Sequence, residues 1–229
     1  MASPELSALS HKVLWAAFLL SFLFGAIAQR THFCTMGAVS DAVTMGDYTR
    51  LRQWALAAGV AMLGFWALAL LGLVDPAKTL YSGSRWLWLS ALVGGLMFGF
   101  GMVLSSGCGS KTLVRVGAGN LKSLVVAVAL GLSAFATLKG ITAVVRVSTV
   151  DRLAVEFAGP ATLPHAAASL LGVPVLTMGA VLALLLGGAL AAWALLGRDF
   201  LRQDNLLAGL GIGGIVAAMW WTSGHLGYV

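Results

Sequence analysis

The sequence is poor in charged residues and in cysteine. Only 10% of its 229 residues are charged, whereas soluble domains average about 25%. It is 59% hydrophobic with a mean hydropathy of +0.94, which excludes an ordinary soluble domain. Its two cysteines are too few for a disulfide framework, and neither belongs to a CxxC or Cys/His metal-binding pattern. We therefore expect no metal and no cofactor.

The apolar residues form continuous runs of about the length of a membrane span. A β-barrel would show alternating apolar residues instead. We therefore expect an all-α, polytopic integral membrane protein with about six hydrophobic helices, some of them short, broken or re-entrant. The apolar runs are Val13–Ala28, Trp54–Val74, Leu87–Leu104, Leu121–Leu138, Val175–Leu196 and Leu206–Trp221.

The chain is expected to form one transmembrane domain, residues 1–229. A polar stretch at 148–173 is predicted to be an extramembrane loop, and two C-terminal helices are predicted within 175–221. The net charge of +6 comes from cations dispersed in short loops. That distribution suits membrane orientation and anion attraction, so no nucleic acid is expected as a partner.

The two cysteine segments align with one another. The pair Phe24-Gly25 comes shortly before Cys34, and Phe98-Gly99 comes before Cys108 at the same separation. Each cysteine follows an apolar run and lies in a polar, glycine-containing segment. Transporters are often built from such repeats, with substrate sites at broken or re-entrant helices. We therefore predict an internal repeat, with units at about 13–74 and 86–147 and a short or broken helix at each cysteine.

A thiol is a weak hydrogen-bond donor and a soft acceptor, which suits a sulfur-containing anion. Nearby cations attract anions, and glycines let the backbone approach a ligand closely. We expect Asp41 to pair with Arg30, and Asn120 to cap the next helix. For Arg50, Arg52, Arg198 and Arg202, extension to the membrane interface is the favoured role. The predicted transport-path residues are Arg30, His32, Cys34, Asp41, Gly107, Cys108, Gly109, Ser110, Lys111 and Arg115.

Two motifs carry a resemblance to a known family. GGLMFGFGMVLSSGCGSKTLVRVGAGNLKSL and QRTHFCTMGAVSD resemble the signature of the YeeE/YedE sulfur-transport family, most strongly over residues 22–53 and 91–125. The resemblance implies a multi-pass protein of the bacterial inner membrane that takes up thiosulfate or a related sulfur-containing anion. It also implies an hourglass-shaped passage in which Cys34 and Cys108 pass the anion along by hydrogen bonds, without covalent capture.

The resemblance leaves the partners and the exact substrate open. Some relatives work with a small soluble sulfurtransferase-like protein, and the YedE relatives are tied to selenium metabolism. Longer members contain two such halves and further cysteines, so either one short chain or a homo-oligomer forms the passage. Two other classes remain as alternatives: a membrane thiol enzyme, either a sulfurtransferase or a disulfide exchanger, and a structural subunit. Transport is favoured over both, because the polar breaks argue against a structural subunit and no base flanks Cys108.

Overall fold

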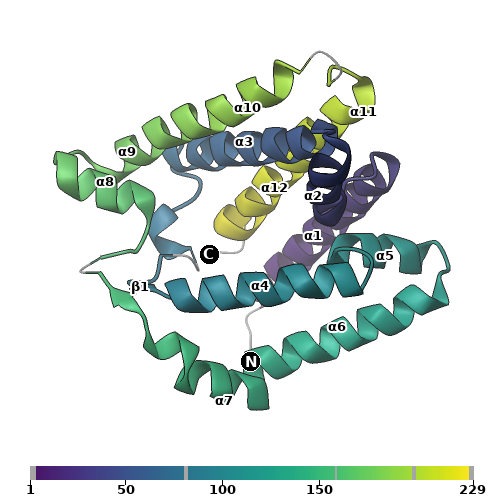
Figure 1. Ribbon diagram of the computed structural model, residues 1–229. Coiled ribbons are helices and arrows are strands. Elements are labelled where there is room, and N and C mark those ends of the chain that lie inside the picture. The colour runs from purple at the N-terminus through teal and green to yellow at the C-terminus, as the bar shows by residue number, and fades with distance from the viewer. Residues whose placement is uncertain (1–3, 80–81, 158, 198–199, 227–229) are drawn as a thin grey trace. The chain divides into compact units, whose positions relative to one another are not determined.

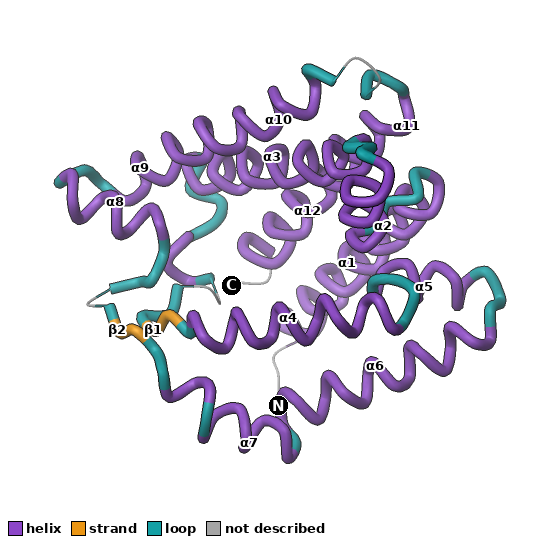
Figure 2. The backbone as a smooth tube through the Cα atoms, viewed as in Figure 1, coloured by secondary structure: helices purple, strands orange, loops and turns teal. Residues whose placement is uncertain are grey.

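The computed structural model describes residues 4–79, 82–157, 159–197 and 200–226. Helices make up most of this part of the chain (Figure 2). Six helical segments are long and apolar enough to cross a membrane, which confirms the predicted all-α, multi-pass membrane fold. These segments are Leu9–Met45, Thr49–Leu70, Trp88–Gly117, Leu121–Lys139, Val175–Leu195 and Gln203–His225.

The chain divides into two compact units. The terminal unit comprises residues 1–80 and 162–229, and the central unit comprises residues 81–161. Each cysteine belongs to a different unit, Cys34 to the terminal unit and Cys108 to the central unit.

The terminal unit is built from α-helices that several π-helical segments extend. Its elements are α1 (Pro4–Arg30), α2 (Thr35–Ser40), η1 (Asp41–Met45), α3 (Thr49–Leu70), η2 (Pro76–Lys78), α8 (Leu163–Leu171), α9 (Val175–Leu182), η4 (Ala183–Gly187), α10 (Gly188–Leu195), α11 (Gln203–Leu206), η5 (Leu207–Gly211), α12 (Ile212–Trp221) and η6 (Thr222–Leu226).

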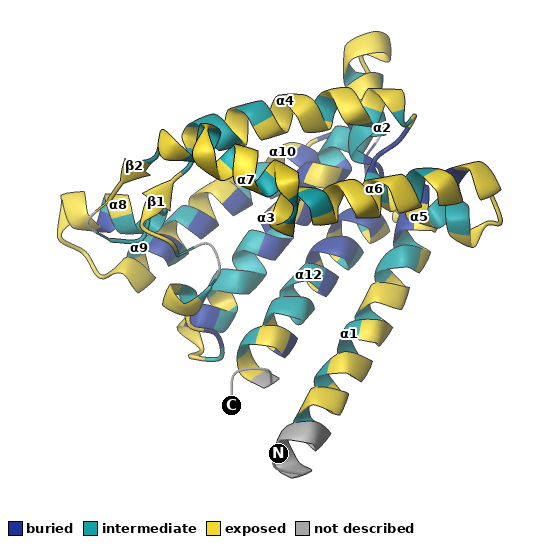
Figure 3. Ribbon diagram, turned by 90° about the horizontal axis from the view of Figure 1, so that it is seen from below, coloured by how far each residue is buried: buried dark blue, intermediate teal, exposed yellow. Residues whose placement is uncertain are grey.

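Helix α3 forms the centre of the terminal unit and packs against α10 and α12 (Figure 1). Figure 3 shows buried positions along α3, and most of them are alanine or glycine. A Cβ atom at Gly59 would lie 2.6 Å from the carbonyl oxygen of Gly187, and one at Gly213 would lie 2.7 Å from that of Ala57. Lipid supplies no hydrophobic drive between helices, so close backbone approach at small residues holds them together instead. At these positions glycine therefore serves tight helix packing.

In its described residues, the central unit contains four α-helices, one 3₁₀ helix and one short pair of strands. Strands β1 (Arg85–Trp86) and β2 (Val155–Glu156) pair antiparallel and tie its two ends together. Asn120 accepts a hydrogen bond from the Ser123 N–H at 3.2 Å, which confirms its predicted role as a helix cap. The remaining elements are α4 (Trp88–Leu104), α5 (Gly109–Gly117), α6 (Leu121–Lys139), α7 (Ile141–Ser148) and η3 (Val150–Arg152).

The first helix is longer than the apolar run predicted. Helix α1 has 27 residues, which corresponds to about 40 Å at 1.5 Å per residue, more than the thickness of a hydrocarbon core. The first apolar run therefore belongs to a full-length helix and not to one of the short or broken helices that were expected. A short helix instead follows each cysteine turn, α2 after Cys34 and α5 after Cys108. The polar stretch 148–173 contains η3, β2 and α8.

Candidate functional site

Helix α1 ends in a turn that leads directly to the first cysteine. The His32 N–H donates to the carbonyl of Gln29 at 3.4 Å, and the Phe33 N–H donates to that of Ala28 at 3.0 Å. His32 itself has a φ of 52°. These two hydrogen bonds around a left-handed residue constitute a Schellman motif, which satisfies the last carbonyl groups of a helix.

Helix α4 ends in the same way before the second cysteine. The Ser106 N–H donates to the carbonyl of Val103 at 3.2 Å, and the Gly107 N–H donates to that of Met102 at 3.2 Å. Ser106 has a φ of 55°. Each hydrogen bond falls at the same separation from Cys108 as its counterpart does from Cys34. The matching geometry supports the internal repeat, which stays a prediction.

Each cysteine then occupies the N-cap position of a short helix. Cys34 precedes α2, Cys108 precedes α5, and both have an extended backbone. Both thiols are buried, with 4% and 6% of the residue exposed. The sulfur of Cys34 accepts a hydrogen bond from the Gly37 N–H at 3.4 Å. The fold thus places both cysteines at polar breaks between helices.

The charged residues near Cys34 are paired differently from the prediction. Asp41 forms an ion pair with Arg50, with Oδ2 and Nη1 3.2 Å apart. Arg30 instead pairs with Asp204 at 3.3 Å, in a contact that is exposed on both sides. The predicted pair of Asp41 with Arg30 is therefore wrong, because the exposed end of α1 meets α11 from the far end of the sequence.

Arg50 is a site candidate that the sequence did not reveal. A Cβ atom at Gly37 would lie 2.6 Å from Nη1 of Arg50, so the guanidinium occupies the space that the missing side chain leaves. The backbone N–H of the same glycine contacts the thiol of Cys34. The guanidinium and the thiol therefore both contact Gly37. The one feature of the sequence that could have indicated this position of Arg50 was Gly37, three residues after Cys34.

Two cations lie around the turn before Cys108. A Cβ atom at Gly107 would lie 3.3 Å from Cδ of Lys111, so the lysine stem packs over this glycine. Nη1 of Arg115 donates to the Ser106 carbonyl at 3.3 Å. The structure therefore brings Gly107, Lys111 and Arg115 together at the second cysteine turn.

Of the other predicted residues, His32 lies within the first turn, and Gly109 and Ser110 begin α5. His32 and Ser110 are exposed, and Gly109 is half-buried. Arg52 stacks on the Trp193 ring at 5.5 Å, and its expected position at the membrane interface stays a prediction. Arg198 lies outside the described residues. In the part of the chain that the structure describes, no cluster of three or more His, Cys, Asp or Glu side chains could hold a metal ion.

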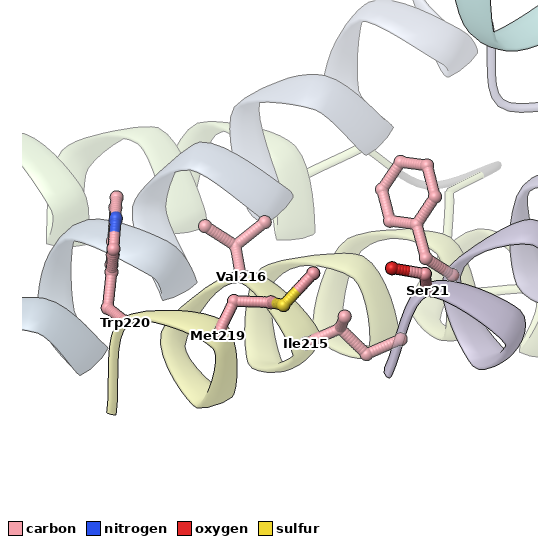
Figure 4. A pocket seen from close by; sticks show the side chains of 6 residues that line it. Ser21, Ile215, Val216, Met219 and Trp220 are labelled. Carbon is pink, nitrogen blue, oxygen red and sulfur yellow. The ribbon is translucent and has the colours of Figure 1, made fainter. Parts of the chain in front are cut away.

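A groove with a volume of about 300 Å³ lies between α1 and α12 (Figure 4). Its lining is apolar apart from the hydroxyl group of Ser21 and the indole N–H of Trp220, so it offers an anion few hydrogen-bond donors. The groove is therefore not a candidate for the anion site. Its other lining residues are Phe24, Ile215, Val216, Met219 and Trp220.

Comparisons with known proteins agree with the resemblance in the cysteine motifs. The sulphur transport family model matches residues 30–229. The thiosulfate transporter TsuA of Spirochaeta thermophila is 32% identical over 130 residues, which are 56% of this chain and 37% of that protein. The Escherichia coli TsuA is 32% identical over 101 residues, 44% of this chain and 27% of that protein. The probable transporter YedE of Escherichia coli is 30% identical over 110 residues, which are 48% of this chain and 26% of that protein. These matches span about a third of each relative or less.

Proposed function

Because the chain belongs to the sulphur transport family, we propose that it carries thiosulfate, or a related sulfur-containing anion, across the bacterial inner membrane. The family and the names of its relatives place the chain among transporters rather than enzymes. The observation that carries this proposal is the duplicated cysteine turn. Two buried thiols stand at matching helix breaks, and each break has cationic side chains beside it.

The chemistry of thiosulfate fits the two kinds of group at each turn. Its terminal sulfur is soft and suits a hydrogen bond with a thiol. Its sulfonate oxygens suit the donors of arginine and lysine. In the proposed path the anion passes from one thiol to the other by hydrogen bonding, and no covalent bond to sulfur forms. Glycines beside the cysteines allow the anion to approach the backbone.

The proposed path includes the residues at both turns. Arg30 and Lys111 attract the anion, while His32 and Arg115 supply further donors at the path. Gly109 and Ser110 offer backbone N–H and hydroxyl groups at the start of α5, and Gly107 leaves room for the anion beside Cys108. Inside the cell, a small soluble sulfurtransferase-like protein would accept the sulfur. The related alternative is the transport of a selenium-containing anion.

The proposal is tested by uptake of labelled thiosulfate into vesicles that contain the purified protein. Uptake above that of protein-free vesicles is the expected result. Parallel measurements with and without an ion gradient identify the energy source, and competition with unlabelled selenium analogues ranks the substrates. Vesicles in which the protein is inserted and folded, yet take up no thiosulfate under either condition, would contradict the proposal.

A further inference from the structure

The ion pair between Arg50 and Asp41 lies at the ends of two predicted membrane spans. Asp41 belongs to the span Leu9–Met45 and Arg50 to the span Thr49–Leu70. The Asp41 side chain is 13% exposed and that of Arg50 is 34% exposed. Ionisable groups within spans are costly to keep there and usually serve a function. This pair therefore calls for a reason beyond the extension to the membrane interface that was expected of Arg50.

The position of Arg50 depends on the lack of a side chain at Gly37. Its guanidinium lies where a Cβ atom would be, on the same residue whose N–H contacts the Cys34 thiol. Asp41 holds the guanidinium there from η1, the continuation of α2. A five-donor planar fork is thus fixed beside the helix that Cys34 caps, and one carboxylate satisfies only part of that fork.

We propose that Arg50 binds the oxyanion end of the substrate while Cys34 contacts its sulfur end. This inference rests on the proposed function and adds a second binding group at the same site. Between substrates, Asp41 neutralises Arg50 and keeps it in place, because a half-buried guanidinium without a counter-charge is costly. An arriving dianion competes with Asp41 for the guanidinium. The site thereby selects anions that carry both oxyanion and soft sulfur ends.

Thiosulfate uptake by reconstituted vesicles tests this role through four variants. Arg50→Gln should raise the half-saturating thiosulfate concentration about tenfold, since a charge-assisted hydrogen bond is lost. Arg50→Lys should fall between Arg50→Gln and wild type, because a point charge replaces the fork. Gly37→Ala keeps every charge but displaces the guanidinium, so it should raise the same concentration. Lys78→Gln is the control, since it removes one cation from an exposed pair with Asp75.

The double variant Arg50→Gln/Asp41→Asn separates substrate binding from a purely structural ion pair. It leaves no unpaired charge, so a structural role predicts uptake like that of wild type. The substrate role predicts that the half-saturating concentration stays raised about tenfold, because the oxyanion ligand is still missing. Thermal unfolding of each purified variant shows whether it is folded.

The results also separate this inference from the proposed function. Wild-type uptake together with unchanged half-saturation in Arg50→Gln and Gly37→Ala would overturn the role of Arg50 and leave the transport function standing. Recovery of the wild-type half-saturating concentration in the double variant would also overturn the role of Arg50 and leave the transport function standing. Absence of uptake by the folded wild-type protein would overturn both.

Discussion

His32 and Ser106 each stand two residues before a cysteine, and both have a left-handed backbone, with φ values of 52° and 55°. Among the described residues they are the two non-glycine positions with positive φ. Helices α3 and α5 end in the same kind of turn at Gly72 and Gly119, where glycine adopts this conformation easily. The cysteine turns thus retain a conformation that costs L-residues energy, as residues at functional sites often do.

Replacement of Ser106 by glycine should stabilise the protein. Glycine adopts the left-handed conformation without the Cβ clash, so we expect a gain of about 1 kcal/mol in the free energy of unfolding. The matched change is Gly119→Ala, at φ 85° in the equivalent position of α5, which should lose a similar amount. Thermal unfolding of the purified proteins in detergent measures both. Destabilisation by Ser106→Gly would mean that the serine side chain matters more than the backbone strain.

The membrane spans were predictable because they depend on local sequence. A run of apolar residues of bilayer length forms a helix wherever it lies in the chain, and six such runs gave six helices. The start of α1 was not predictable from hydropathy alone. Its backbone hydrogen bonds continue to Pro4, through polar residues that a helix accommodates outside the apolar layer.

The pairing of charges was less predictable because it depends on tertiary structure. Arg30 and Asp204 are 174 residues apart, and only the folded terminal unit brings them together. Asp41 was left to pair with Arg50, which the sequence presented as an ordinary interfacial arginine. Space beside Gly37 decides the position of its guanidinium, and a missing side chain gives little signal in a sequence rich in glycine.

Neighbouring glycines of α12 should respond differently to alanine. A Cβ atom at Gly213 would lie 2.7 Å from both the Ala57 carbonyl oxygen and Cβ of Val60, whereas one at Gly214 meets no atom within 4 Å. Overpacking of this kind costs about 1–3 kcal/mol. Gly213→Ala should therefore destabilise the protein, and Gly214→Ala should be neutral or favourable because alanine is the better helix former. Unfolding in detergent compares them, and equal effects would show that α3 and α12 are not packed this closely.

A buried hydrogen bond between side chains should stabilise the contact of α3 with α11. Nε2 of Gln53 donates to Oδ1 of Asn205 at 2.8 Å, and the two residues are 3% and 8% exposed. Such bonds in membrane proteins contribute about 0.6 kcal/mol on average and up to about 1.7. Gln53→Leu should cost about 1 kcal/mol or more, because it also leaves a buried amide without this partner.

A double-mutant cycle isolates the bond between Gln53 and Asn205. Gln53→Leu, Asn205→Leu and their combination are compared in unfolding experiments. The double variant should be less destabilised than the sum of the single variants, since neither polar partner remains. Strictly additive effects would show that the two amides do not interact in the folded protein.

The thiols of Cys34 and Cys108 should both be needed for uptake, because both stand at turns of the same geometry. Cys34→Ala and Cys108→Ala remove the group proposed to contact the sulfur end of the anion, so each should lose most uptake. Cys→Ser at either position keeps a hydrogen-bonding group but replaces a soft atom with a hard one, and should retain part of the uptake.

All variants are compared at equal amounts of inserted, folded protein, since alanine fits a buried site with little loss of stability. Loss of uptake in one alanine variant alone would confine the mechanism to one turn. Full uptake by both would remove the thiols from the mechanism and leave the cations beside them to carry the anion.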